Sequence, residues 1–148
     1  MVSSTEVKKP FWQVPHEVRL RVRYSETDQM QVVYYAHYAV YCEVARTEWL
    51  RRLGLTYAEM EEKMGVLLPV RHFSITYHRP ARYDDELRIE TQLAEPPGTR
   101  LHFRHKIYRD SLLLAEAEVL LVFTNKFTWR PCRPPEAFYE ALAQVSTE

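Results

Sequence analysis

Three consecutive strand-like segments in the second half of the chain, of which the first two alternate apolar and polar residues, restrict the fold more than any other feature. They are residues 86–93, 100–108 and 112–124. A period of two is typical of β-strands, because successive side chains point to opposite faces of a sheet. The last segment is apolar on nearly both faces, which predicts a central strand.

A fourth strand is predicted over residues 66–78, where Pro69 indicates an edge or a bulge. The links at 82–85, 95–98 and 109–111 carry turn-forming residues. Short links of this kind join antiparallel partners, so we expect consecutive strands to be neighbours in one sheet.

The first half of the chain combines a strand with two helices. Residues 18–24 alternate apolar side chains with three arginines and predict a strand. Residues 36–53 carry apolar side chains at helical spacing, and Gly54 follows as the expected C-terminal residue. The predicted buried face consists of Tyr38, Tyr41, Cys42, Ala45, Trp49 and Leu53, with Glu43, Arg46, Thr47 and Arg51 largely elsewhere.

Two shorter helices complete the predicted elements. A capping box beginning at Thr56 starts a short helix that Gly65 ends. A terminal helix is expected after Pro135, with Phe138 and Leu142 on its buried side. The predicted organisation is an N-terminal arm, residues 1–15, followed by a single α+β domain, residues 16–148.

Composition excludes several classes of protein. The formal net charge is zero, which argues against a nucleic-acid partner, and no apolar run is long enough to span a membrane. The N-terminus has no apolar signal region, so we expect a cytoplasmic protein. Cys42 and Cys132 are expected as free thiols, and the histidines lack the spacing of a metal site.

The stretch from Tyr24 to Tyr38 passes from a strand through a polar turn into a helix, and Asp28 is the carboxylate in that turn. Asp28 and Gln31 have the spacing of a helix capping box, which is one interpretation. The β-branched and aromatic residues 32–35 are poor helix starters, however, so the helix is expected to begin near Tyr35 or Ala36. Asp28 would then lie ahead of the helix, where it could face a substrate.

Four motifs resemble, in the same order, those of hotdog-fold thioesterases, and in particular the 4-hydroxybenzoyl-CoA thioesterase branch and its Tol-Pal-associated acyl-CoA thioesterase relatives. They are Thr27-Asp28 with Val33-Tyr34-Tyr35, Glu43-Val44-Ala45-Arg46, the segment 80–85 (PARYDD) and the segment 115–119 (AEAEV). The resemblance implies a hotdog fold, with a long central helix wrapped by a curved antiparallel sheet. It also implies an acyl-CoA thioester hydrolase that needs no cofactor, the CoA being part of the substrate. The expected assembly is a homodimer or a dimer of dimers with its active site at the subunit interface.

The same resemblance implies roles for individual residues. Asp28 acts as nucleophile or general base, and the backbone N–H of Tyr35 polarises the thioester carbonyl. Glu43, on the helix, is a further candidate catalytic residue, or else a solvated side chain paired through Arg46 or Thr47. Tyrosines 34, 38 and 41 are expected in the core or a subunit interface rather than in catalysis.

Binding of the nucleotide end of CoA is implied for Thr99, Arg100 and Arg104, whose alternative is an ordinary solvated strand face. Gln31 departs from the family pattern, which has glycine there, so the turn loses the residue best suited to a positive φ.

Two other functions remain open: a catalytically weak acyl-CoA-binding scaffold, and a hotdog dehydratase or hydratase, whose histidine-bearing motif is not evident. The preference for a particular acyl group depends on side chains that meet across the subunit interface, which the sequence does not reveal.

Overall fold

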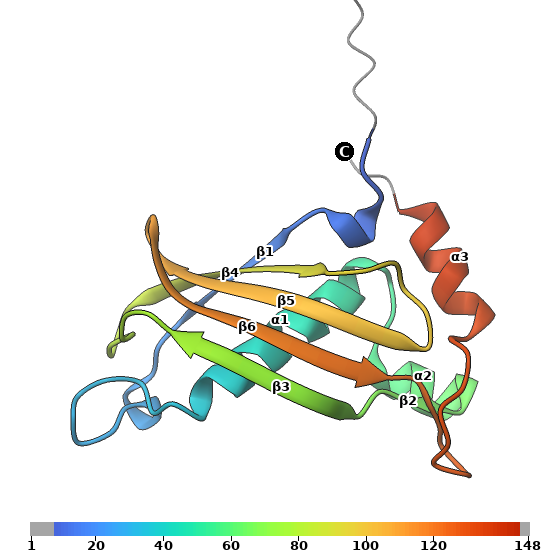
Figure 1. Cartoon of the computed structure of the whole chain (residues 1–148), viewed down its shortest axis with the longest axis horizontal. Helices are drawn as coiled ribbons and strands as arrows, with labels where there is room; N and C mark the ends of the chain where they lie inside the picture. The colour runs from blue at the N-terminus through green and yellow to red at the C-terminus, as the bar shows by residue number, and fades with distance from the viewer. Residues whose placement is uncertain (1–7, 146–148) are drawn as a thin grey trace, which may run out of the picture.

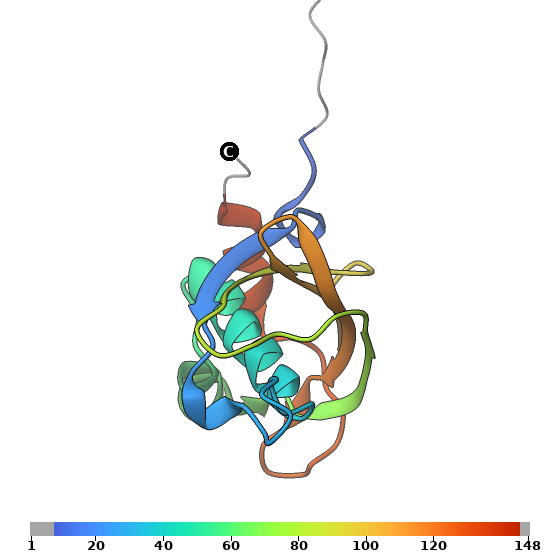
Figure 2. The ribbon, with the colours of Figure 1, turned by 90° about the vertical axis from the view of Figure 1, so that its left-hand side faces the viewer.

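A five-stranded antiparallel sheet curves around helix α1, as Figures 1 and 2 show. The computed structural model describes residues 8–145. Its strands are β1 (His16–Arg21), β2 (Val66–Leu67), β3 (Val70–Tyr77), β4 (Glu86–Leu93), β5 (Arg100–Arg109), β6 (Leu112–Val122) and β7 (Thr124–Asn125). Its helices are α1 (His37–Arg52), α2 (Tyr57–Met64) and α3 (Glu136–Gln144), with 3-10 turns η1 (Phe11–Gln13) and η2 (Tyr24–Glu26). The predicted α+β class is confirmed.

The order of the strands is β1-β4-β5-β6-β3, while β2 and β7 form a separate pair. The predicted hairpins β4–β5 and β5–β6 are present, and β6 lies inside the sheet as expected. Pro69 separates β2 from β3, and β3 lies at the sheet edge with an irregular register near Val70. These features agree with the expected edge or bulge.

The expectation that all consecutive strands are neighbours is wrong for β3 and β4, because β5 and β6 lie between them. The turn at residues 82–85 does form, with the Asp85 N–H donating to the Arg82 carbonyl at 3.2 Å. Residues 78 and 79, however, donate to the Leu114 carbonyl, which keeps the end of β3 beside β6. The link therefore crosses the end of the sheet before β4 begins.

The first strand is also displaced from its prediction. β1 ends at Arg21, and Tyr24 begins the 3-10 turn η2. The N–H of Glu26 donates to the Arg23 carbonyl at 3.0 Å, which turns the chain away from the sheet. The alternating pattern of residues 22–24 thus continues past the end of the strand.

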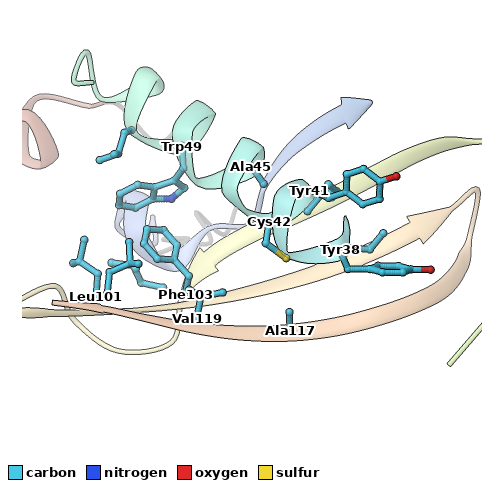
Figure 3. Packing of buried hydrophobic residues seen from close by; sticks show 14 of the residues in the cluster. Tyr38, Tyr41, Cys42, Ala45, Trp49, Leu101, Phe103, Ala117 and Val119 are labelled. Atoms are coloured by element: carbon cyan, nitrogen blue, oxygen red, sulfur yellow. The ribbon is translucent and has the colours of Figure 1, made fainter. Parts of the chain in front are cut away.

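The core lies between α1 and the concave face of the sheet (Figure 3). The indole ring of Trp49 packs edge-to-face on the ring of Phe103 of β5, with the ring centroids 5.1 Å apart. Cys42 lies over the small side chain of Ala117 (Figure 3). All six residues predicted for the buried face of the helix are buried. Arg46 is buried as well, at 5% exposure, which corrects its placement outside the core. It follows Cys42 by four residues and precedes Trp49 by three, so it shares their side of the helix.

The helix termini follow the sequence signals. The Thr56 hydroxyl accepts the N–H of Glu59 at 3.1 Å, and Gly65 ends α2 with a φ of 68°. Helix α3 begins after Pro135 and buries Phe138 against Phe123, with the centroids of the two rings 5.2 Å apart. Ahead of β1, the ring of Phe11 packs on Trp49, while residues 1–7 of the predicted arm lie outside the described residues.

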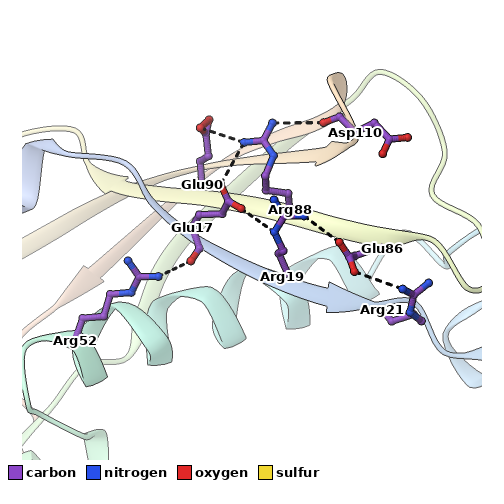
Figure 4. A network of polar contacts seen from close by, with 8 residues as sticks. All are labelled: Glu17, Arg19, Arg21, Arg52, Glu86, Arg88, Glu90 and Asp110. Atoms are coloured by element: carbon purple, nitrogen blue, oxygen red, sulfur yellow. Dashed lines mark hydrogen bonds and ion pairs between the residues drawn. The ribbon is translucent and has the colours of Figure 1, made fainter.

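The convex face of β1 and β4 carries a ladder of charged side chains (Figure 4). Arg19 contacts Glu17 at 2.9 Å and Glu86 at 3.0 Å, and Arg88 contacts Glu90 at 3.4 Å. Exposed pairs of this kind contribute about 0–1 kcal/mol each, so the ladder mainly keeps this face polar. Within residues 8–145, no helix is long and apolar enough to cross a membrane.

Candidate active site

Asp28 lies at the tip of a tight chain reversal between η2 and α1. Its N–H donates to the Val32 carbonyl at 2.9 Å, and its carbonyl accepts the N–H of Gln31 at 2.9 Å. Thr27 and Val33 form an isolated antiparallel bridge that closes the reversal. The Oδ1 atom of Asp28 accepts the N–H of Met30 at 2.9 Å, which orients the carboxylate.

Asp28 is therefore not the cap of a helix. Helix α1 begins nine residues later, at His37, with Ala36 as its N-terminal flanking residue. The predicted start near Tyr35 or Ala36 is confirmed to within two residues, and its physical reason is the run of β-branched and aromatic residues before it. The carboxylate consequently stands ahead of the helix, in a turn of its own.

A buried carboxylate, Glu26, holds this loop against the body of the protein. Glu26 is only 4% exposed and accepts hydrogen bonds from the Arg23 N–H at 2.9 Å, the Arg23 Nε at 3.1 Å and the Tyr41 hydroxyl at 2.9 Å. Its backbone carbonyl also accepts the N–H of Tyr34 at 2.9 Å. Burial acts to raise the pKa of Glu26, but these hydrogen bonds outweigh it and lower the pKa overall. Sequence reasoning missed Glu26, although its spacing of three from Arg23 is that of a capping box.

Asp28 lines two separate hollows. The first, of about 280 Å³, lies between the Asp28 turn, the start of α1 and the end of β3. Its other lining residues are Met30, Val32, Val33, Tyr35, Tyr38, Tyr77, His78, Arg79 and Pro80. The second, of about 350 Å³, is also lined by Tyr24, Thr27, Gln31, Arg82 and Tyr83. We call these the first and the second hollow.

Tyr35 lines the first hollow and is held there by a hydrogen bond. Its carbonyl accepts the Tyr77 hydroxyl at 3.0 Å, which ties the residue to the end of β3. Within residues 8–145, the N–H groups of Tyr35 and Ala36 donate to no protein acceptor. Unpaired donors of this kind are expected where a helix begins, and they can stabilise a negatively charged oxygen.

Gln31 adopts the left-handed conformation that the family pattern reserves for glycine, with a φ of 66°. This conformation costs a residue with a side chain about 1–2 kcal/mol. Gln31 nevertheless forms the turn, and it lines the second hollow together with Asp28.

Glu43 lies on the exposed side of α1, outside the lining of both hollows. The Thr47 hydroxyl donates to the Glu43 carbonyl at 2.9 Å, and Arg46 turns inward. Within the described part of the chain, the Glu43 carboxylate forms no ion pair with either residue. Its catalytic role remains a prediction.

The residues predicted to bind CoA lie away from Asp28 in a single chain. Thr99 and Arg100 precede and begin β5, whereas the last residue of that strand, Arg109, reaches Pro80 and Asp85 near the Asp28 loop. A ten-residue strand is about 30 Å long. Arg104 lies between these ends, in a different hollow of about 520 Å³, with Glu118 at 3.4 Å. The structure therefore does not bring Thr99, Arg100 and Arg104 together with Asp28 in one chain.

The histidines occupy unrelated environments. His105 is buried, with its Nδ1 2.9 Å from the Thr91 hydroxyl, and the neighbouring His102 points to the outer face near Glu118. Burial, followed by the charge of Arg46, lowers the pKa of His105 to about 3. Among residues 8–145, no cluster of three possible ligands could hold a metal ion. Cys42 and Cys132 are free thiols, as expected.

Comparisons with known proteins identify the class to which this fold and turn belong. The model of the thioesterase-like superfamily matches residues 22–142. The acyl-CoA thioester hydrolase YbgC of Escherichia coli is 37% identical over 127 residues, covering 84% of this chain and 93% of YbgC. The chain belongs to the thioesterase-like superfamily.

Solved structures agree with that assignment. A hypothetical protein of Thermus thermophilus, TT1821, has a TM-score of 0.79 at 40% identity, covering 86% of this chain and 96% of that one. The DHNA-CoA thioesterase of Staphylococcus aureus has a TM-score of 0.82 at 26% identity, and the match covers 89% of this chain and 91% of that one. The family resemblance predicted from the four sequence motifs is thus confirmed.

Proposed function

We propose that this protein is an acyl-CoA thioesterase, which hydrolyses a thioester to a free carboxylic acid and CoA. The observation that carries the proposal is that Asp28 and Tyr35, the residue with an unpaired backbone donor, line the same hollow. The name of the E. coli relative YbgC supports the same chemistry. A carboxylate, an N–H group and water are sufficient for this reaction, and CoA is part of the substrate.

In this mechanism the thioester carbonyl oxygen accepts the Tyr35 N–H, which stabilises the charge that develops on that oxygen. The Asp28 carboxylate either takes a proton from the attacking water or attacks the carbonyl carbon itself. In the second route an anhydride forms, the carbon–sulfur bond breaks, and the thiolate takes a proton to become CoA. Water then hydrolyses the anhydride and regenerates the carboxylate.

A homodimer joined through β3 completes the proposal, and two such dimers could form a tetramer. β3 lies at the sheet edge, where its backbone can pair with another strand, and Val70 and Tyr77 are large exposed apolar residues at its ends. Val40 and Val44 of α1 are exposed too. A second copy pairing at β3 would lie beside Tyr77, which lines the first hollow.

The replacement D28N tests the catalytic assignment. Asparagine keeps an oxygen that can accept the Met30 N–H, so the turn should persist while proton transfer and nucleophilic attack are lost. We expect thiol release from acyl-CoA to fall by about 10²–10⁴-fold with little change in melting temperature. The matched control is D110N, in the β5–β6 turn, which should retain activity.

The assay should use short, long and aromatic acyl-CoA substrates. Full hydrolysis by D28N of every thioester that the wild type cleaves would exclude the assignment of Asp28. Release of CoA from no thioester, together with measurable CoA binding, would instead support the acyl-CoA-binding scaffold.

A further inference from the structure

Helix α1 starts from a turn whose carbonyls are all paired. Three successive carbonyls each accept the N–H group three residues further along the chain: Tyr34 from His37 at 2.9 Å, Tyr35 from Tyr38 at 3.4 Å and Ala36 from Ala39 at 3.2 Å. In a turn of this kind the carbonyls point along the helix and the leading N–H groups point ahead of it. In the described part of the chain, the N–H groups of Tyr35 and Ala36 have no protein acceptor, so their direction depends on how firmly the turn is held.

One side chain from outside the helix holds the backbone of this turn. The Tyr77 hydroxyl donates to the Tyr35 carbonyl at 3.0 Å, which is within the usual range for a hydroxyl donor. The N–H of Tyr38 reaches the same carbonyl only at 3.4 Å, which exceeds the usual range for an amide donor. Tyr77 therefore provides the stronger of the two restraints on this carbonyl.

The restraint on the carbonyl also acts on the neighbouring donors. A peptide unit is planar and trans, so holding the Tyr35 carbonyl fixes the direction of the Ala36 N–H and limits rotation about the Cα–C bond of Tyr35. A hydrogen bond accepted by the carbonyl also polarises its peptide unit, which strengthens the N–H as a donor. The Tyr77 hydroxyl thus influences the start of α1 without being part of it.

Tyr77 is itself held by the sheet and the core. It is the last residue of β3 and pairs with Ala115 of β6. Its ring packs edge-to-face on the ring of Tyr38, with the centroids 5.1 Å apart, and Tyr38 is only 3% exposed. The Tyr38 hydroxyl accepts the N–H of Ala81 at 3.1 Å, which fixes that ring in turn. A group on a packed strand holds a position more precisely than one on a loop.

We propose that Tyr77 is a positioning residue of the thioesterase reaction, which orients the N–H groups at the start of α1 by holding the Tyr35 carbonyl. This inference rests on the function proposed above, in which the Tyr35 N–H stabilises the developing oxyanion. Donors aimed before the reaction stabilise that charge without reorganising as it forms. In this role the Tyr77 hydroxyl transfers no proton and need not contact the substrate.

The replacement Y77F tests the inference, because it removes the hydroxyl and keeps the ring that packs on Tyr38. We expect kcat to fall by about 3–10-fold, the effect of one neutral hydrogen bond, with KM within about twofold of the wild type. The loss should be the same for short, long and aromatic acyl-CoA substrates, since the turn acts on the thioester and not on the acyl group. The shape of the pH profile of kcat should not change, because the hydroxyl transfers no proton.

The control is Y139F, which removes the hydroxyl of an exposed tyrosine on α3 and should keep kcat within about twofold of the wild type. Three results for Y77F would each overturn the inference. An unchanged kcat would show that the hydroxyl has no role. A rise in KM that depends on the acyl group would show that the hydroxyl contacts the substrate. A changed pH profile would show that it takes part in proton transfer.

Backbone ¹⁵N relaxation separates this inference from the proposed function. We expect lower order parameters at Tyr35 and Ala36 in free Y77F than in the free wild type. If the wild type hydrolysed no thioester, the proposed function would fail and the catalytic part of the inference with it, while the order parameters would still decide whether Tyr77 holds the turn. Equal order parameters in Y77F and an active wild type would overturn the inference and leave the proposed function intact.

Discussion

Replacing Glu26 by glutamine tests whether a buried carboxylate anchors the Asp28 loop. The Oε1 atom of Glu26 accepts two hydrogen bonds of 2.9 Å, from the Arg23 N–H and the Tyr41 hydroxyl, and its other oxygen accepts the Arg23 Nε at 3.1 Å. A glutamine side chain has one oxygen, so in either orientation its NH₂ group faces a donor. At least one charge-assisted hydrogen bond is lost.

A glutamine with its oxygen at the Oε1 position can keep the bonds from the Arg23 N–H and the Tyr41 hydroxyl, but these bonds are no longer charge-assisted. A hydrogen bond to a charged group contributes about 1.5–3 kcal/mol and a neutral one about 0.5–1.5 kcal/mol, so each of the two bonds loses about 1 kcal/mol. The Arg23 guanidinium adds little, because that side chain is 77% exposed. We therefore expect E26Q to lower the free energy of unfolding by about 2 kcal/mol at pH 7. For a chain of this length, the melting temperature should fall by about 4–8 °C. The control E86Q, in the exposed ladder, should change stability by less than about 0.5 kcal/mol.

The dependence on pH provides a second signature. The folded pKa of Glu26 is lowered from its ordinary value of 4.5, so its stabilisation is fully present above pH 4.5 and is lost as the pH falls through the lowered pKa. Glutamine does not titrate. Urea denaturation should show a difference between wild type and E26Q that is constant from pH 7 to about 5 and shrinks below pH 4.5.

A difference below about 0.5 kcal/mol at pH 7, or one that grows as the pH falls, would refute this reasoning. The replacement Y41F removes one donor to the carboxylate. In a double-mutant cycle with E26Q, the two losses should therefore be less than additive, since E26Q weakens the same hydrogen bond that Y41F removes.

Two further predictions concern Gln31 and His105. Q31G should raise the free energy of unfolding by about 0.5–1 kcal/mol, because glycine relieves the left-handed strain by more than it adds to the entropy of the unfolded chain. Q29G, in the same turn, should not raise it. A melting temperature of Q31G below that of the wild type would contradict this prediction. His105 has a folded pKa lowered to about 3, so its contribution is present above pH 6.5 and is lost as the pH falls toward 3. Between pH 6 and 4, the unfolding free energy of the wild type should change with pH more steeply than that of H105Q, by about 1.4 kcal/mol per pH unit. H72Q, at an exposed histidine, is the control. Equal slopes for the wild type and H105Q would show that His105 does not titrate in this way.

Much of the fold was predictable because its signals are local. The period of two along residues 86–93, the helical spacing from Tyr38 to Leu53 and the caps at Thr56 and Gly65 each depend on neighbours within a few residues. The weak helix starters after Asp28 likewise predicted that this carboxylate precedes α1. The order of the family motifs along the chain then selected Asp28 and Tyr35 as candidates.

Tertiary structure alone decided the remaining features, because they depend on contacts between segments distant in sequence. The neighbours of β3 and β4 are determined by pairing with β6 and β1, which no local turn signal encodes. The burial of Glu26 depends on Tyr41, fifteen residues away. Most importantly, the second hollow exists only because the turn at residues 82–85 lies beside the Asp28 loop, so that Arg82, Tyr83 and Gln31 line the same space.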